Sequence, residues 1–145
     1  MSVTRALRPV LILAAMASAV LAVGYGAAHD GPGSSHSPGM ITERDHANGN
    51  TIHVAVGDKV VLILGSSYWN FMGSSSPAVV RQVGSVRLLR SSHSCPPGVG
   101  CQPKRALYKA IGPGKAVISA DRLSCGEALA CTGSQRHFRL TVIVR

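Results

Sequence analysis

Residues 105–121 read RALYKAIGPGKAVISAD, and this stretch carries the clearest structural pattern in the sequence. Apolar or small side chains recur at every second position on both sides of the glycine–proline–glycine at 112–114. Such alternation is typical of β-strands that bury one face, and Gly-Pro-Gly is a strong turn signal. The stretch therefore predicts two strands, 105–111 and 115–121, joined by a turn. Their inward side chains are Ala106, Tyr108, Ala110, Ala116, Ile118 and Ala120.

Short runs of β-branched and apolar residues, separated by glycine and proline, extend this pattern in both directions. They predict strands at 51–56, 59–64, 78–83, 85–89 and 137–144, and a loop or irregular strand at 67–72. No window beyond residue 28 carries a helical stripe. Several short strands with turns between them predict an all-β, immunoglobulin-like antiparallel β-sandwich over residues 51–145.

The first 28 residues have the layout of a secretory signal peptide. Arg5 and Arg8 give a positive start, residues 10–23 are uncharged and apolar, and Gly26 and Ala28 suit cleavage after Ala28. The apolar run is shorter than the roughly 20 residues that a membrane span needs. An uncleaved membrane anchor stays an alternative, and only then would the chain contact a membrane.

Between this leader and the predicted sandwich, residues 29–50 are rich in Gly, Pro, Ser, His and Asn. Such a composition predicts a flexible linker. The 145 residues thus divide into a signal peptide (1–28), a linker (29–50) and one domain (51–145). The expected location is secreted or extracytoplasmic.

Four cysteines, Cys95, Cys101, Cys125 and Cys131, form two equally spaced pairs. Exported proteins meet oxidising conditions, so disulfides are expected. Four cysteines allow three connectivities. Local pairing, Cys95 with Cys101 and Cys125 with Cys131, is favoured because both segments are rich in Gly, Pro and Ser. A zinc site is the alternative, but structural zinc usually wants ligands two to four residues apart.

The net charge of the chain indicates which kinds of partner it would attract. The chain has a net charge of +9, and removal of Arg5 and Arg8 leaves 13 basic against 6 acidic residues, or +7. This charge favours anionic neighbours such as cell-envelope polymers, acidic proteins or lipid head groups. The basic residues are scattered and aromatic residues are few, which argues against nucleic acid.

No constellation of catalytic or metal-binding residues appears in the sequence. The serines at 74–76 lack a Gly-x-Ser-x-Gly elbow, and acidic residues to orient a triad are scarce. The six histidines are spread out, and no methionine follows Cys131 and His137 to complete a copper site. We therefore predict a protein that is not an enzyme and that carries no metal and no cofactor.

The aromatic cluster near residue 70 is the best functional lead. Trp69 is the single tryptophan, with Tyr68 and Phe71 beside it. Tyrosine and tryptophan often anchor interfaces, whereas a single tryptophan in such folds often packs in the core. If Trp69 points inward, Tyr68 points outward, because neighbours in an extended segment face opposite sides.

The order of features from residue 57 onward resembles the chagasin-like inhibitors of papain-type cysteine proteases. The resemblance lies in the core spacing, in Tyr68-Trp69 and in the alternating last strand. The matching residues are Gly57, Val60, Leu62, Leu64, Tyr68, Trp69, Gly98, Gly100, Tyr108, Ala110, Gly114, Phe138, Leu140, Val142 and Val144. Two loop signatures differ: Gly65-Ser66-Ser67 stands for the family's Asn-Pro-Thr-Thr-Gly, and Arg122-Leu123-Ser124 for its Arg-Pro-Trp.

The resemblance implies an immunoglobulin-like sandwich that blocks a protease cleft with three loops at one end, at 65–73, 91–104 and 121–136. The partner would be a protein, with a papain-type cysteine protease as the most concrete case. The predicted partner-binding residues are Ser67, Tyr68, Trp69 and Arg122. The alternative from another class is a structural or adhesive cell-envelope module that binds anionic partners.

Overall fold

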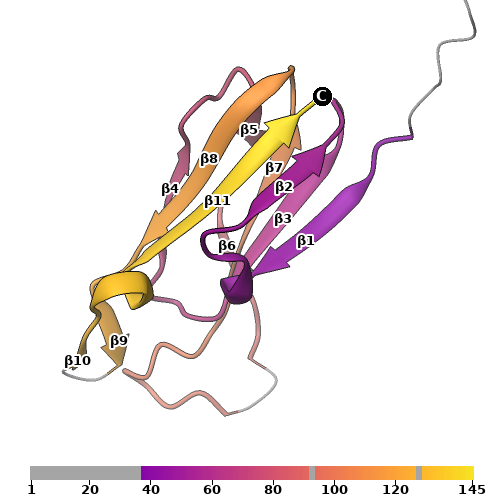
Figure 1. The fold of residues 1–145 in the computed structure, drawn as a ribbon. Helices are drawn as coiled ribbons and strands as arrows, with labels where there is room; N and C mark the ends of the chain where they lie inside the picture. The colour runs from indigo at the N-terminus through magenta and orange to yellow at the C-terminus, as the bar shows by residue number, and fades with distance from the viewer. Residues whose placement is uncertain (1–36, 92–93, 127–128) are drawn as a thin grey trace, which may run out of the picture. The chain divides into compact units, whose positions relative to one another are not determined.

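The computed structural model describes residues 37–91, 94–126 and 129–145. Within these residues the chain forms two β-sheets and a short hairpin (Figure 1). The first sheet contains β1 (Met40–Arg44), β3 (Lys59–Leu64), β7 (Lys104–Ala110), β5 (Val80–Gln82) and β6 (Arg87–Leu88). The second contains β2 (Thr51–Val54), β11 (His137–Val144), β8 (Gly114–Asp121) and β4 (Asn70–Ser74). The hairpin is β9 (Ser124–Gly126) with β10 (Leu129–Ala130), and two 3₁₀ turns are η1 (Asp45–Ala47) and η2 (Gly133–Gln135).

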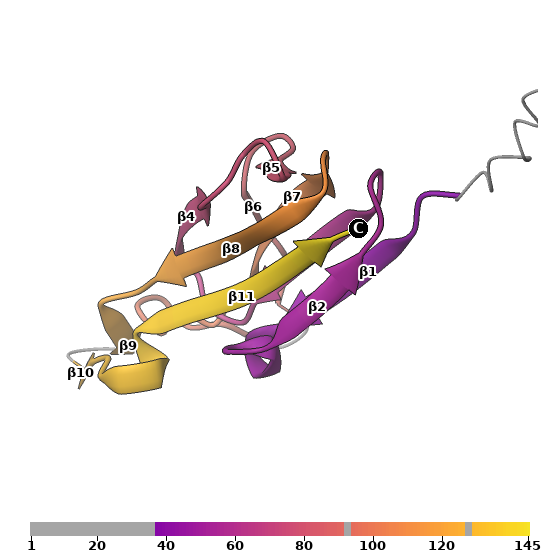
Figure 2. The same cartoon turned by 45° about the horizontal axis from the view of Figure 1, so that its top comes forward.

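The two sheets face each other across one hydrophobic core, as the alternating strands predict (Figure 2). In β11 and β8 every second side chain is buried, and these two strands pair over eight residues. The core is built mainly from valine, leucine and alanine, with Tyr108, Phe138 and Trp69 as its aromatic members. This arrangement confirms the predicted all-β, immunoglobulin-like sandwich.

Among the described residues, two core side chains bury a polar atom that has no hydrogen-bond partner: Trp69, at Nε1, and Tyr108. The Tyr108 side chain is fully buried, and its hydroxyl has no hydrogen-bond partner among the described residues. Burial raises the pKa of Tyr108 to about 12, because the phenolate would lose its hydration. The phenol is therefore held neutral inside the sandwich.

The predicted turn at 112–114 carries the chain from one sheet to the other. Strand β7 lies in the first sheet and β8 in the second, so the two strands that flank the turn do not pair with each other. Gly114 has φ +138°, and a Cβ there would lie 3.0 Å from Val79 Cγ2. The turn thus needs glycine for both its backbone angle and its close approach.

Residues 40–47 correct the prediction of a flexible linker over 29–50. They form β1 and η1, and β1 pairs in parallel with β3. Only Ile41 of β1 packs against the core, so the strand has little sequence signal. Just before β1, the Gly39 backbone N–H donates to Asp58 Oδ1 at 2.7 Å. A second parallel pair, β2 with β11, also departs from a purely antiparallel arrangement.

Other boundaries differ by a few residues. β4 begins at Asn70, β5 and β6 are shorter than the predicted 78–83 and 85–89, and the β9–β10 hairpin was not predicted. The predicted signal peptide, 1–28, lies outside the described residues, as do residues 29–36 of the linker. Among the residues that are described, no helix is long and apolar enough to cross a membrane.

Candidate partner-binding loops

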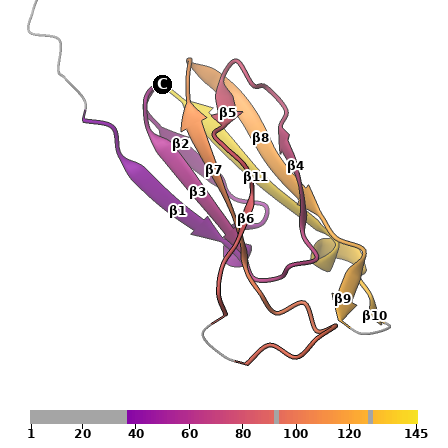
Figure 3. The same ribbon diagram turned by 180° about the vertical axis from the view of Figure 1, so that it is seen from behind.

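Three loops gather at one end of the sandwich, as Figures 1 and 3 show. We call them loop 1 (residues 65–69, between β3 and β4), loop 2 (89–103, between β6 and β7) and loop 3 (122–136, between β8 and β11). Strand register explains the gathering. Leu64 at the end of β3 pairs with Lys104 at the start of β7, and Asp121 at the end of β8 pairs with His137 at the start of β11.

Trp69 of loop 1 lies in the core. It is 3% exposed, and its ring meets Phe138 edge-on, with 6.4 Å between ring centroids and 78° between planes. Of the two expectations for Trp69, an interface anchor or a core residue, the structure shows the core residue. In this state Trp69 offers almost no surface to a partner.

Arg122 of loop 3 lies over the face of the Trp69 ring. Its guanidinium carbon is 4.4 Å from the Trp69 ring centroid, within the range of a cation–π interaction. The Arg122 Nε–H donates to the Gln135 carbonyl at 2.7 Å, and the Arg122 backbone N–H donates to the Arg136 carbonyl at 2.9 Å. Arg122 thus joins the start of loop 3 to its end and both to the core.

Tyr68 points away from the core, as its position next to Trp69 predicts, but it is not free. Its hydroxyl donates to the Gly98 carbonyl of loop 2. A Cβ on Gly100 would lie 2.2 Å from Tyr68 Cε2, so the ring rests directly on the Gly100 backbone. The Ser67 backbone N–H donates to the Gly100 carbonyl at 2.9 Å. Ser67 and Tyr68 therefore hold loop 2 against loop 1.

Both predicted disulfides have the local connectivity. Cys95 bonds Cys101 in loop 2 and Cys125 bonds Cys131 in loop 3, with Cα atoms 5.7 Å and 5.1 Å apart. In loop 3 the bridge spans the β9–β10 hairpin, and the Cys131 backbone N–H donates to the Leu123 carbonyl at 2.9 Å. The described residues contain no free cysteine.

The exposed side chains of these loops include large apolar ones that the sequence analysis did not single out. Leu123 is 70% exposed, Leu129 61% and Val99 43%. Leu123 also lines a shallow pocket between loop 3 and β4, together with Tyr68, Asn70, Met72, Asp121, Arg122 and Ser124. The sequence pattern that could have identified these three residues is the presence of apolar side chains inside loops rich in Gly, Ser and Pro. Exposed apolar side chains beside a pocket are typical of a binding surface.

The described residues of the loop end bring one histidine and one carboxylate together, His137 and Asp121. His137 Nδ1 lies 2.8 Å from Asp121 Oδ1, but both side chains are about half exposed, and no nucleophile joins them in the contacts of the described residues. Nowhere in 37–91, 94–126 and 129–145 do three or more His, Cys, Asp or Glu side chains cluster as a metal site would require.

No protein-family model matches this sequence, and no curated protein matches it either. Solved structures that share its fold include the following two. The solution structure of amebosin is 21% identical over 75% of this chain and 100% of amebosin, with a TM-score of 0.51. The crystal structure of the cysteine protease inhibitor EhICP2 from Entamoeba histolytica is 12% identical over 79% of this chain and 100% of that one, with a TM-score of 0.53. At these identities the likeness establishes a common fold.

Proposed function

We propose that this protein is a secreted inhibitor of papain-type cysteine proteases that blocks the active-site cleft with loops 1, 2 and 3. The observation that carries the proposal is the set of three mutually supported loops at one end of the sandwich. The likeness of its fold to that of a cysteine protease inhibitor supports the choice of partner. Inhibition of this kind needs binding alone and requires no catalytic residues.

Preorganisation is the first argument in favour. Binding costs free energy when loops must be ordered, and a loop that is already fixed avoids much of this cost. Loop 2 is closed by Cys95–Cys101 and rests on Tyr68, while loop 3 is closed by Cys125–Cys131 and rests on Trp69 through Arg122. The described residues of both loops are therefore held in place before a partner arrives.

The distribution of exposed apolar side chains is the second argument. Val99, Leu123 and Leu129 project from loops 2 and 3. Burying these apolar side chains against a partner removes them from water, which favours binding. Tyr68, Trp69 and Arg122 then act by holding the loops in place, and Leu123, Leu129 and Val99 supply the contact.

Export fits the same proposal. Two disulfides form readily in oxidising compartments, and residues 1–28 have the layout of a cleaved leader. N-terminal sequencing of the protein from culture supernatant should return His29 as the first residue. Recovery of Met1 or Ser2 from the membrane fraction would contradict export by cleavage.

The test of inhibition uses the purified oxidised protein, papain and a fluorogenic peptide substrate, with trypsin as a protease of another class. We expect competitive inhibition of papain and none of trypsin. Combining Leu123→Glu with Val99→Glu should raise the inhibition constant at least tenfold, because both changes place a charge on a surface that must lose water.

Ile111 supplies the matched control. It is 38% exposed and lies in the β7–β8 turn at the end of the sandwich opposite the three loops. Ile111→Glu makes the same chemical change and should leave inhibition unaltered. Equal effects of the control and the double variant, or no inhibition of papain by the native protein, would refute the proposal.

A further inference from the structure

The outer face of the first sheet presents cationic side chains in two rows. Register places Met40, Lys59, Lys109 and Arg81 side by side in one row, and Arg44, Ile63, Arg105 and Arg87 in another. Their neighbours along each strand, such as Val60 and Tyr108, point into the core. The two rows lie four residues apart along the strands, or roughly 13 Å.

An apolar row lies between them. It contains Val61 and Leu107, with the exposed Thr42 at one edge. Val83 lies at the other edge, where its backbone N–H donates to the Leu107 carbonyl. Val61 is only 4% exposed and Leu107 is half-buried, so this row forms a floor below the long cationic side chains. None of the three rows contains a carboxylate.

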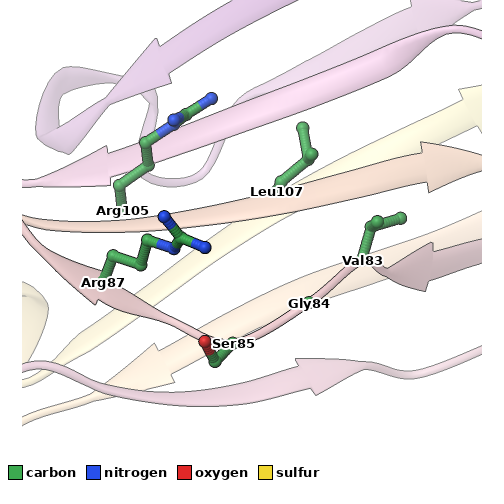
Figure 4. Close-up of a pocket in the computed structure, with 6 residues that line it drawn as sticks. All are labelled: Val83, Gly84, Ser85, Arg87, Arg105 and Leu107. Carbon is green, nitrogen blue, oxygen red and sulfur yellow. The ribbon is translucent and has the colours of Figure 1, made fainter.

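A pocket marks the point at which the cationic row meets this floor. Figure 4 shows it lined by Arg87, Arg105, Ser85, Gly84, Leu107 and Val83. Arg87 and Arg105 are directly opposite each other in the β6–β7 pair. Like charges in that position repel and destabilise a sheet. Neither guanidinium makes an ion pair or a side-chain hydrogen bond within the described part of the chain, so their charge is left for a ligand.

From this face we infer a second binding site, independent of the loops, for an anionic polysaccharide. Six cationic side chains, Arg44, Lys59, Arg81, Arg87, Arg105 and Lys109, supply the charge complementarity. The apolar floor fits the CH faces of sugar rings, and the rows on both sides fit carboxylate or sulfate groups on alternating sides of the polymer. One such group would lie in the pocket, where two guanidinium groups and the Ser85 hydroxyl can donate hydrogen bonds to it.

The same features disfavour other polyanions. No aromatic side chain lies in the three rows, so single-stranded nucleic acid would find nothing on which to stack its bases. Val61 and Leu107 are recessed below the cationic side chains, and the exposed apolar side chains of this face, Met40 and Val83, lie in different rows. A surface that inserts into a bilayer presents a continuous protruding apolar face.

The experiment measures binding of the oxidised protein to heparin and to polygalacturonate, which carry sulfate and carboxylate respectively, with dextran as the neutral polymer. We expect binding to at least one anionic polysaccharide, none to dextran, and weaker binding as salt is raised. Combining Arg87→Gln with Arg105→Gln should weaken binding at least tenfold. Combining Lys59→Gln with Lys109→Gln should weaken it several-fold.

The matched control removes the same charge from the other sheet. Lys115 and Arg139 are exposed on the outer faces of β8 and β11, and Lys115→Gln with Arg139→Gln should leave binding within twofold. An equal loss in the control would show that only net charge matters and would overturn the inference. Tighter binding to single-stranded DNA, to polyglutamate or to phosphatidylglycerol vesicles than to both polysaccharides would also overturn it.

Thermal unfolding shows that each variant is folded, and the papain assay keeps the two sites apart. The Arg87 and Arg105 variant should inhibit papain as the native protein does. Failure of polysaccharide binding with inhibition intact would overturn this site alone, and failure of inhibition with polysaccharide binding intact would overturn the proposed loops alone.

Discussion

Loops 2 and 3 carry disulfides of equal sequence separation, yet the rest of the protein supports them differently. Loop 2 is held from outside, by Tyr68 and Ser67 of loop 1. Loop 3 is held from inside, by its own β9–β10 hairpin and by Arg122 on the buried Trp69. Equal disulfides therefore do not make equally supported loops. The position of loop 2 depends on the partly buried Tyr68 side chain and on one backbone hydrogen bond from Ser67, whereas that of loop 3 depends on the core.

The largest expected effect comes from removing the core support of loop 3. Trp69→Ala should lower the free energy of unfolding by about 3–5 kcal/mol, because a large buried ring leaves a cavity. Chemical denaturation measures this loss. Trp69→Phe keeps a ring against Phe138 and should cost less. In this milder variant hydrogen exchange should rise more in loop 3 than in loop 2, and the reverse order would break the comparison.

The second prediction compares the loss of each disulfide, which should cost similar stability but should loosen the two loops to different extents. Replacing Cys95 and Cys101 by serine, or Cys125 and Cys131 by serine, should each cost about 2–3 kcal/mol, since loops of equal length constrain the unfolded chain equally. The native-state consequences should differ. Without its bridge, loop 3 keeps Arg122 on Trp69, whereas loop 2 keeps only its contacts with loop 1. Protease nicking should therefore appear first in loop 2 of the Cys95 and Cys101 variant.

The third effect isolates the contact between loops 1 and 2. Gly100→Ala places a Cβ where the Tyr68 ring lies, at a residue with φ +70°. We expect a loss of about 2 kcal/mol, part of it from the left-handed backbone and part from displacement of Tyr68. Gly49→Ala is the matched control, because Gly49 has φ +85° and open space around its Cβ position. An equal loss in both variants would mean that the Tyr68 contact contributes nothing.

The fourth effect compares two tyrosine hydroxyls. Tyr68→Phe removes the hydrogen bond to the Gly98 carbonyl and should cost about 1 kcal/mol, with faster hydrogen exchange in loop 2. Tyr108→Phe removes a hydroxyl that has no partner, so it should be neutral or slightly stabilising at pH 7. A larger loss for Tyr108→Phe than for Tyr68→Phe would contradict the assignment of these two roles.

The raised pKa of Tyr108 also predicts how the stability of the protein changes at alkaline pH. Its pKa is raised by burial from 10.0 to about 12, so the folded protein keeps the proton that the unfolded chain releases. Its contribution to stability is complete below pH 10 and is lost as the pH rises through 12. Denaturation at pH 8 and pH 11 should show this decline in the native protein, and Tyr108→Phe should show a smaller one.

The sequence predicts those features of the fold and of the loops that depend on residues close together in the chain. Alternation at 105–121 and 137–144 predicts strands, and the equal cysteine spacing predicts local disulfides, because neighbouring residues decide both. Strand β1 was missed because only one of its side chains, Ile41, packs against the core and the strand it pairs with, β3, is distant in sequence. The contacts of Tyr68 with Gly100, and of Trp69 with Arg122, join residues far apart in sequence, and only the fold brings them together.

Strand β11 ends at Val144, and the Arg145 backbone N–H donates to the Val54 carbonyl at 3.0 Å, at the end of the sandwich opposite the three loops (Figure 1). A biotin or a fluorophore joined to this terminus would therefore stand a full strand length away from loops 1, 2 and 3. Such a label would let the protein be fixed to a sensor chip with its loops facing the solution. Protease capture could then be recorded in real time without chemical modification of the recognition surface.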